Sequence, residues 1–344
     1  MELVIQNMLT EENTFSELAR WYLEVSAPQK LKDHTIFNYR LLLTDFVIPY
    51  LGDTKLSIIS PVTVDNLLAS LRENGSPKTG RVLKASTVNQ IRMVLSAVFT
   101  VAVKKHIVNE NPVVSSTPVR IDCTSRPFLD IRECRKIIKL CDDLKNKQVG
   151  RAVKFLLLTG LRRGELVGLI WKDIDFKKRE VKISRTVFRS AGKTYTGTPK
   201  SATSVRTVAL GDKAVQILDD QKCYAEQLCA ANRIDFSNLL PVFMNRKCGK
   251  MNGDYLNNAF RKMMTESGLS GMHIHDLRHA NASILINEGV PMKVVSEHLG
   301  HSSALVTEQF YIHLFPDSLR ITAKVIDTVL KYKEARKTGL LSVN

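Results

Sequence analysis

The spacing of apolar residues changes once along the chain, and this change limits the possible folds more than any other feature. Over the first 106 residues, apolar side chains recur at helical intervals in four segments, which begin near Thr14, Asp33, Ser60 and Ser86. Residues 107–127 contain prolines and show no period, which predicts a linker between two domains. We therefore expect a bundle of four helices before the linker and a separate domain after it.

Residues beyond 127 mix helical and extended patterns. The segments EVKISRTVF, KTYTGTPK and SVRTVAL are rich in β-branched residues and alternate with turn residues, which predicts three antiparallel strands. The expected fold class is mainly α, with a helical domain followed by an α+β domain that contains a small antiparallel sheet. Helical spacing recurs at about residues 130–145, 149–159, 211–231, 253–267, 276–288, 291–299 and 318–334. The parts expected along the chain are an extension at 1–13, the bundle at 14–106, the linker at 107–127 and the α+β domain at 128–344.

The charge balance favours a polyanionic partner. Lys and Arg number 50 against 34 Asp and Glu, a net charge of +16. Phosphates neutralised by such side chains release counterions, so nucleic acid is a better expectation than a membrane surface. Inspection finds no stretch of about 20 apolar residues and no secretion signal at the start, so we expect a cytoplasmic protein. The six cysteines form no Cys-x-x-Cys pair and are expected to be reduced thiols without a role.

Two segments of the second half place a cation where it could meet a phosphate. In TGLRRGEL, residues 159–166, the two glycines permit a tight turn, and the guanidinium of Arg162 can hold two phosphate oxygens at once. In TPKS, residues 198–201, Lys200 lies between two expected strands and can reach outward as a donor. Both segments are typical of an anion site.

Two further segments add proton-carrying side chains. HIHDLRH, residues 273–279, puts His275 and Arg278 three residues apart and so on one face of a helix. HLGH, residues 298–301, is followed ten residues later by Tyr311. Aromatic residues make up 7% of the chain and are not interleaved with the basic ones, which favours backbone contacts with a duplex over stacking on single strands.

In this order, the four segments resemble the signature of the tyrosine recombinase, or phage integrase, family. The helical first half, from Thr14, also resembles the SAM-like domain that binds core DNA in this family. The resemblance implies the integrase of a mobile element or a Xer-like recombinase. Such an enzyme cleaves and rejoins duplex DNA through a 3′-phosphotyrosine intermediate, with no metal, no ATP and no other cofactor.

The resemblance also implies a role for each matching residue. Arg162 and Arg278 would clamp the scissile phosphate and neutralise the charge that develops in its transition state, and Glu165 would orient the arginines. Tyr311 would attack the phosphorus in line. An ordinary phenol, with a pKa of about 10, is a poor nucleophile at neutral pH, so it needs the positive surroundings that these residues supply.

Three more residues match positions that handle protons or donate to the phosphate. The resemblance implies that Lys200 protonates the departing 5′ oxygen, that His275 supports proton transfer and that His301 donates a second hydrogen bond. Lys182 and Lys193 lie in the same strand region and remain alternatives to Lys200, because the register of a hairpin can slip. Arg163 is expected to be solvated or to contact the backbone.

The resemblance further implies partners. Relatives act as homotetramers on two double-stranded DNA sites, and a helix that corresponds to residues 318–333 docks on a neighbouring protomer. Packing of this helix on its own domain is the alternative. Accessory DNA-bending or directionality proteins and association with the bacterial nucleoid would also fit the family.

Three other interpretations compete with this one. HIHDLRH has some likeness to a metallohydrolase motif, but its Asp directly follows the second His and no cluster of acidic ligands accompanies it, so we expect no metal. Four other histidines of the second half are expected to pack or to support the site: His273, His279, His298 and His313. A type IB topoisomerase would share the chemistry without a specific site. A non-catalytic DNA-binding regulator would share only the fold.

Overall fold

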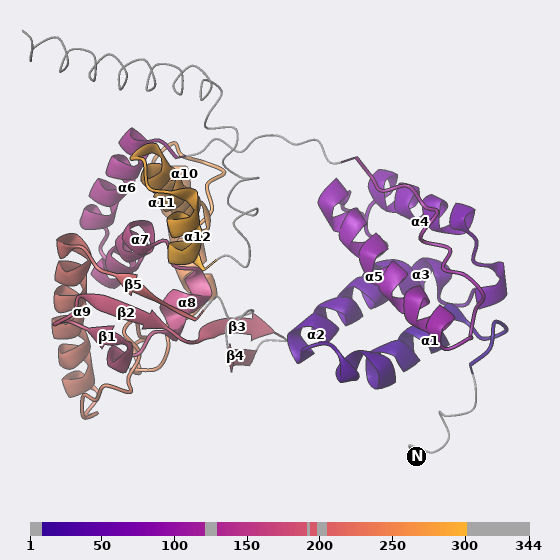
Figure 1. The fold of residues 1–344 in the computed structure, drawn as a ribbon, viewed down its shortest axis with the longest axis horizontal. Helices are drawn as coiled ribbons and strands as arrows, with labels where there is room; N and C mark the ends of the chain where they lie inside the picture. Colours follow the sequence, from indigo (N-terminus) through magenta and orange to yellow (C-terminus); the bar gives the residue numbers. More distant parts are fainter. Residues whose placement is uncertain (1–8, 121–128, 191–192, 198–204, 301–344) are drawn as a thin grey trace, which may run out of the picture. The chain divides into compact units, whose positions relative to one another are not determined.

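The structure is a computed structural model that describes residues 9–120, 129–190, 193–197 and 205–300. The described chain forms two compact units. The first spans residues 9–120. The second spans residues 129–300, except for Ser190 at the tip of a hairpin. The first unit is all helical and the second is α+β (Figure 1). The predicted fold class is therefore confirmed.

The first unit is a bundle built around its longest helix. Its helices are α1 (Phe15–Trp21), α2 (Asp33–Leu42), α3 (Ile48–Leu51), α4 (Pro61–Glu73) and α5 (Ala85–Lys104), with π-helical turns at Tyr22–Ser26 and Leu43–Val47 and 3₁₀ turns at Ala27–Gln29 and Leu56–Ile58. Two of these helices begin directly after the expected residues, which cap them. Thr14 and Glu17 form a capping box at α1, and Ser60 caps α4 with Pro61 at its first position.

Helix α5 forms the apolar centre of this unit. Val88, Ile91, Leu95 and Phe99 are buried along it, and the Phe99 ring stacks on Phe15 of α1 at 5.9 Å. Among the described helices, α5 alone is long and apolar enough to span a membrane. The sequence analysis predicted no segment of this kind. Its buried stripe explains the composition, because the central helix of a bundle is apolar on most sides.

The segment expected to be a linker belongs in part to the first unit. Val113 is fully buried in the bundle core, and Arg92 donates to the carbonyls of Val113 and Ser116 at 3.0 and 2.8 Å. Asn89 of α5 pairs with the backbone of Val119 in both directions. Residues 107–119 thus pack on the first unit, because side chains of α5 hold a segment that has no period of its own.

The second unit carries helices around a small sheet. Its helices are α6 (Ile131–Asp143), α7 (Lys147–Thr159), α8 (Arg163–Gly168), α9 (Asp212–Ala231), α10 (Gly253–Glu266), α11 (Asp276–Asn287) and α12 (Met292–Leu299), with a 3₁₀ turn at Trp171–Asp173. Helix α7 contacts α6, α9 and α11 and so lies at the centre. The five described cysteines of this unit are free thiols, as expected.

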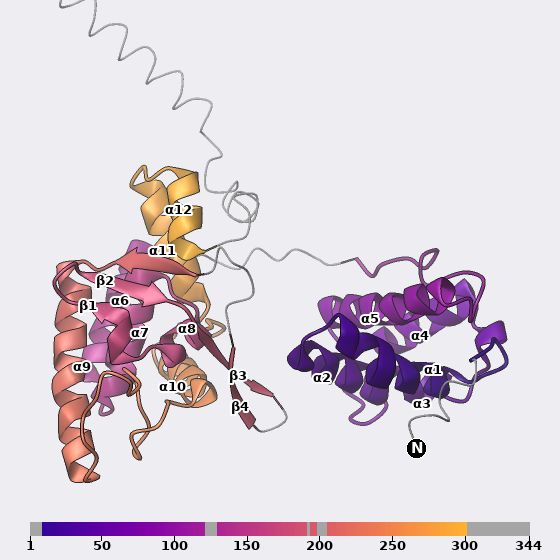
Figure 2. The ribbon, with the colours of Figure 1, turned by 60° about the horizontal axis from the view of Figure 1, so that its bottom comes forward.

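The described strands form two separate sheets, whereas one small sheet of three antiparallel strands was predicted. Strands β1 (Ile174–Asp175), β2 (Glu180–Ile183) and β5 (Arg206–Ala209) make an antiparallel sheet in the order β1-β2-β5, whereas β3 (Thr186–Ser190) and β4 (Lys193–Gly197) pair separately (Figure 2). EVKISRTVF was expected to be one strand. It divides at Arg185, which donates to Asp173 at 2.5 Å and ties the chain to the main body.

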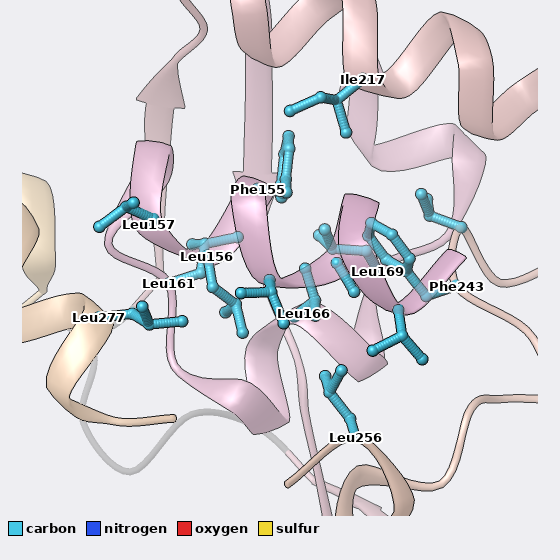
Figure 3. Packing of buried hydrophobic residues seen from close by; sticks show 14 of the residues in the cluster. Phe155, Leu156, Leu157, Leu161, Leu166, Leu169, Ile217, Phe243, Leu256 and Leu277 are labelled. Carbon is cyan, nitrogen blue, oxygen red and sulfur yellow. The ribbon is translucent and has the colours of Figure 1, made fainter. Parts of the chain in front are cut away.

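A continuous apolar core joins these elements. Figure 3 shows Phe155, Leu156 and Leu157 of α7 packed among Leu166 of α8, Leu277 of α11, Phe243 and Leu256. Each buried side chain of this size stabilises the unit by roughly 1.5–3 kcal/mol relative to an exposed position. The core thus holds the C-terminal end of α7 and the starts of α8 and α11 in fixed positions, and these ends carry the candidate site.

Candidate active site

Two helices of the second unit end at glycines that turn the chain sharply. Gly160 follows α7 with φ 64°, and Gly300 follows α12 with φ 68°. Both are left-handed conformations that favour glycine. The last carbonyls of a helix have no partner inside it and carry partial negative charge. These two turns therefore offer acceptors for cations.

Arg278, from the first turn of α11, binds both turns. Its side chain is buried, with 3% of the residue exposed. Nη1 donates to the Gly160 carbonyl at 2.8 Å, and Nη2 donates to the Leu299 carbonyl at 2.6 Å. A buried guanidinium needs such partners, because leaving its donors unpaired would cost several kcal/mol.

Arg162 reaches the same turn from the start of α8. Its Nη2 donates to the Gly300 carbonyl at 3.1 Å, and its Nη1 donates to Glu165 Oε1 at 2.8 Å. The Arg162 side chain is 36% exposed. Arg278 and Arg162 therefore bind the carbonyls of two consecutive residues, Leu299 and Gly300.

Glu165 lies beneath this pair and is 2% exposed. It accepts the backbone N–H of Arg162 at 2.9 Å, and its two oxygens accept from the Arg206 guanidinium at 3.2 and 3.0 Å. Burial by itself would raise the pKa of Glu165. The hydrogen bonds and charge of Arg206, with those of Arg162, outweigh burial and leave this pKa below its ordinary value. The carboxylate is therefore ionised at neutral pH.

Sequence reasoning missed Arg206, although its strand contains a signal. In β5, burial alternates so that Val208 and then Leu210 face the core, and Arg206 stands two residues earlier on that same face. An arginine at an inward position of an otherwise apolar face needs a buried acceptor as its partner, and a carboxylate is the acceptor that also balances its charge. The pattern indicates such a pair but does not identify Glu165.

His275 precedes α11 and stands at the edge of the arginine pair. Its ring lies 5.0 Å from the His279 ring in an edge-to-face arrangement. Part of the ring is open to solvent, yet the surrounding protein removes enough hydration, helped by the charges of His279, Arg278 and Arg162, to lower the pKa of His275 to about 4. In this state the imidazole is neutral at pH 7 and can accept a proton.

The other predicted site residues lie outside the described residues. These are Lys200, His301 and Tyr311. The described strands β4 and β5 flank the segment of Lys200 in sequence, and Gly300, which accepts from Arg162, directly precedes His301. Within the described part of the chain, the structure brings together Arg162, Glu165, His275 and Arg278.

The neighbouring candidates take other roles. Arg163 points away from the pair and donates to the Gly253 carbonyl at 3.2 Å and to Asp254 at 3.1 Å, so the expected backbone contact is confirmed. His298 is partly buried, and its carbonyl accepts from Arg206 Nε at 2.7 Å. Among the described residues, no group of three His, Cys, Asp or Glu side chains could hold a metal ion.

The Gly160 turn gives a stability prediction. A Cβ at Gly160 would lie 2.7 Å from both Asn281 Oδ1 and Leu299 Cδ2, and Asn281 is itself held by the carbonyls of Leu157 and Leu158. Gly160→Ala should therefore lower the free energy of unfolding by about 2–4 kcal/mol, from left-handed strain and a clash together. Urea unfolding monitored by circular dichroism measures this change.

Gly289→Ala is the matched control for this variant. Gly289 has φ 82°, but a Cβ there meets nothing within 4 Å, so only the strain of about 1–2 kcal/mol should remain. Equal losses in the two variants would show that the contact of Gly160 with Asn281 and Leu299 does not constrain the site.

The low pKa of His275 gives a pH prediction. Between about pH 6.5 and 4 the unfolded chain binds a proton at this residue that the folded protein does not, so stability falls as the pH drops through this window. His275→Asn cannot take up that proton. Its Tm should therefore fall less than the wild-type Tm between pH 7 and pH 4.5, as measured by scanning calorimetry. Parallel Tm curves for the two proteins would contradict the assigned environment.

Two family models match the chain. The model described as the phage integrase family matches residues 127–317, and the model described as the phage integrase N-terminal SAM-like domain matches residues 14–72. The first match alone covers more than half of the chain. The chain therefore belongs to the phage integrase family, the tyrosine site-specific recombinases.

Individual relatives agree with this assignment. The chain is 28% identical over 281 residues to a tyrosine recombinase XerC-like protein of Caldanaerobacter subterraneus subsp. tengcongensis. The aligned residues cover 76% of this chain and 69% of that protein. It is 27% identical over 295 residues to the ICEBs1 integrase of Bacillus subtilis, covering 85% of this chain and 77% of that integrase.

Solved structures share the fold. A Tn1549 transposon integrase in complex with a circular intermediate DNA superposes with a TM-score of 0.74 at 21% identity, covering 91% of this chain and 99% of the other. A lambda integrase dimer bound to a COC′ core site gives a TM-score of 0.65 at 19% identity, covering 87% and 77%. At these identities the likeness concerns the fold.

Proposed function

We propose that this recombinase integrates or excises a mobile element by cutting and rejoining duplex DNA, with Tyr311 as its nucleophile. One observation carries the proposal: Arg162 and Arg278, far apart in sequence, place their guanidiniums on the adjacent carbonyls of Leu299 and Gly300. Two planar donors held by the carbonyls of consecutive residues could together bind the non-bridging oxygens of one phosphodiester. The chain then runs directly into the segment that holds His301 and Tyr311.

The proposed cleavage exchanges one phosphoester bond for another. The Tyr311 oxygen attacks the phosphorus, a bond forms between them, and the bond to the 5′ oxygen breaks. Lys200 gives a proton to the departing 5′ oxygen, while the phenolic proton passes toward the neutral imidazole of His275. The arginines stabilise the added negative charge, and His301 donates to a phosphate oxygen. A 5′ hydroxyl from another strand then reverses these steps and restores the phosphodiester.

This exchange of phosphoester bonds needs no external source of free energy. The phosphotyrosine bond has nearly the same free energy as the phosphodiester that it replaces, so the reaction is reversible and requires neither ATP nor a metal ion. The protein supplies positioning and positive charge, which are the main demands of phosphoryl transfer. The ionised Glu165 binds Arg162 and so offsets part of its positive charge beside Arg278 before DNA arrives.

The proposed partners follow from the family. A lambda integrase has been solved as a tetramer bound to a Holliday junction and as a dimer on a core site. We propose that four copies of this chain act on two double-stranded sites, that the segment 318–333 links protomers, and that accessory proteins bend DNA or set the direction. The reaction would take place on the nucleoid in the cytoplasm.

The test uses the attachment site of the element, obtained by sequencing the junctions between the element and its host DNA beside the gene. Purified protein is incubated with a labelled duplex of that site in EDTA without nucleotide, then denatured. A covalent adduct between the protein and the 3′ phosphate of the broken strand is expected. Relaxation of any plasmid without site preference would instead indicate a topoisomerase, and tight binding without strand cleavage would indicate a regulator.

A further inference from the structure

Arg206 is not part of the four sequence motifs, yet its side chain contacts several groups of the site. Its side chain is 6% exposed, and it comes from β5, which follows the segment of Lys200 in sequence. Nη1 and Nη2 donate to the two oxygens of Glu165, and Nε donates to the His298 carbonyl at 2.7 Å. One guanidinium therefore connects α8, the sheet and the end of α12.

The contact with Glu165 divides that carboxylate between two arginines. Oε1 accepts from both Arg162 at 2.8 Å and Arg206 at 3.2 Å, and Oε2 accepts from Arg206 at 3.0 Å. If Arg206 were neutral, the buried carboxylate would have Arg162 as its single described cationic partner. Glu165 would then hold Arg162 more strongly, and the positive charge offered to a phosphate would fall by one unit.

A second contact concerns the turn before His301. A Cβ at Gly300 would lie 2.9 Å from Nη1 and 3.0 Å from Cδ of Arg206, so the guanidinium packs directly on the Gly300 backbone. The Gly300 carbonyl is the group that Arg162 binds. Arg206 thus supports this peptide from one side while Arg162 binds it by its carbonyl.

We propose that Arg206 is a positioning residue of the recombination reaction. It neutralises Glu165 so that the Arg162 guanidinium remains available to the scissile phosphate, and it fixes the turn that leads into His301. This inference rests on the proposed function, because it concerns the phosphate site of that reaction. It assigns Arg206 no contact with DNA.

The test compares single and paired substitutions on the attachment-site duplex. In Arg206→Gln, cleavage at saturating DNA should fall about 100-fold, the loss typical of one misplaced transition-state donor, while the half-saturating DNA concentration stays within about threefold. Adding Glu165→Gln removes the charge that would hold Arg162. The double variant should regain at least about tenfold in rate over Arg206→Gln alone. Rates are measured well below each variant's Tm.

Arg185→Gln is the matched control. Arg185 donates to Asp173 in another partly buried ion pair of the same unit, at 2.5 Å and with side chains 29% and 6% exposed. It should lose stability like Arg206→Gln yet keep the wild-type cleavage rate. If Arg206→Gln fails to fold, the double variant and Arg206→Lys still test the proposal, since neither leaves a buried carboxylate with Arg162 as its single described cationic partner.

The outcomes separate this inference from the proposed function. Wild-type protein that forms no adduct contradicts the function itself. Wild-type protein that forms the adduct, with Arg206→Gln cleaving at an equal rate, overturns only the role of Arg206. A rate loss that the double variant does not relieve, or that Arg185→Gln shares, would likewise overturn it, because it would reduce Arg206 to a contribution to folding.

Discussion

Tyr311→Phe is expected to abolish the covalent adduct between protein and DNA. The substitution removes one oxygen, and without it no phosphotyrosine bond can form, whatever the other residues do. The expected loss is complete within detection, at least about 10⁴-fold, whereas the affinity for the attachment-site duplex should change by less than about threefold. A denaturing gel of the labelled duplex measures the adduct, and a mobility shift measures binding.

Tyr255→Phe controls for the loss of a tyrosine hydroxyl in the same unit. Tyr255 is 51% exposed, and its hydroxyl accepts from Asn146 at 3.1 Å, not from a residue of the arginine pair. This variant should form the adduct at the wild-type rate. Persistent adduct in Tyr311→Phe would show that another residue is the nucleophile.

Arg162→Lys is expected to reduce cleavage by about 10³-fold and to leave DNA binding nearly unchanged. Lysine keeps the charge but loses the planar fork, so it cannot bind Glu165, the Gly300 carbonyl and a phosphate oxygen together. The cost of one lost transition-state donor is about 10²–10³-fold, and the displaced turn before His301 adds to it. Single-turnover cleavage at saturating DNA measures the effect.

Arg163→Lys is the control next in sequence. Its side chain is 38% exposed, close to the 36% of Arg162, but its guanidinium binds the Gly253 carbonyl and Asp254. It should cleave DNA within a few-fold of wild type. Similar losses of binding and cleavage in Arg162→Lys would instead assign Arg162 to anchoring the DNA.

Helices were the part of the fold that the sequence predicted best. Thr14, Ser60 with Pro61, and the apolar stripe of α5 act through local capping and periodic burial, which a single segment contains in full. The arginine, histidine and tyrosine motifs could also be found, because their order follows a known family. The pairing of Arg162 with Arg278 became visible only in the structure, since it depends on where α12 ends.

The features that were missed depend on partners distant in sequence. The segment at Val113 has no period, and it is ordered by Arg92 of α5. The break between β2 and β3 depends on Arg185 reaching Asp173. Arg206 carries a local signal, but its partner Glu165 lies on another element. In each case a charged or polar side chain contacts a distant residue, and hydrophobic spacing contains no information about that contact.

The most direct measurement is to identify the residue joined to DNA. The adduct is trapped on a duplex nicked beside the cleavage position, so that the short released strand diffuses away, then digested with trypsin and nuclease for mass spectrometry. The tryptic peptide of residues 294–320 contains Tyr311 as its sole tyrosine. The account predicts that this peptide carries a 3′-linked nucleotide on Tyr311. A nucleotide on any other residue would contradict it.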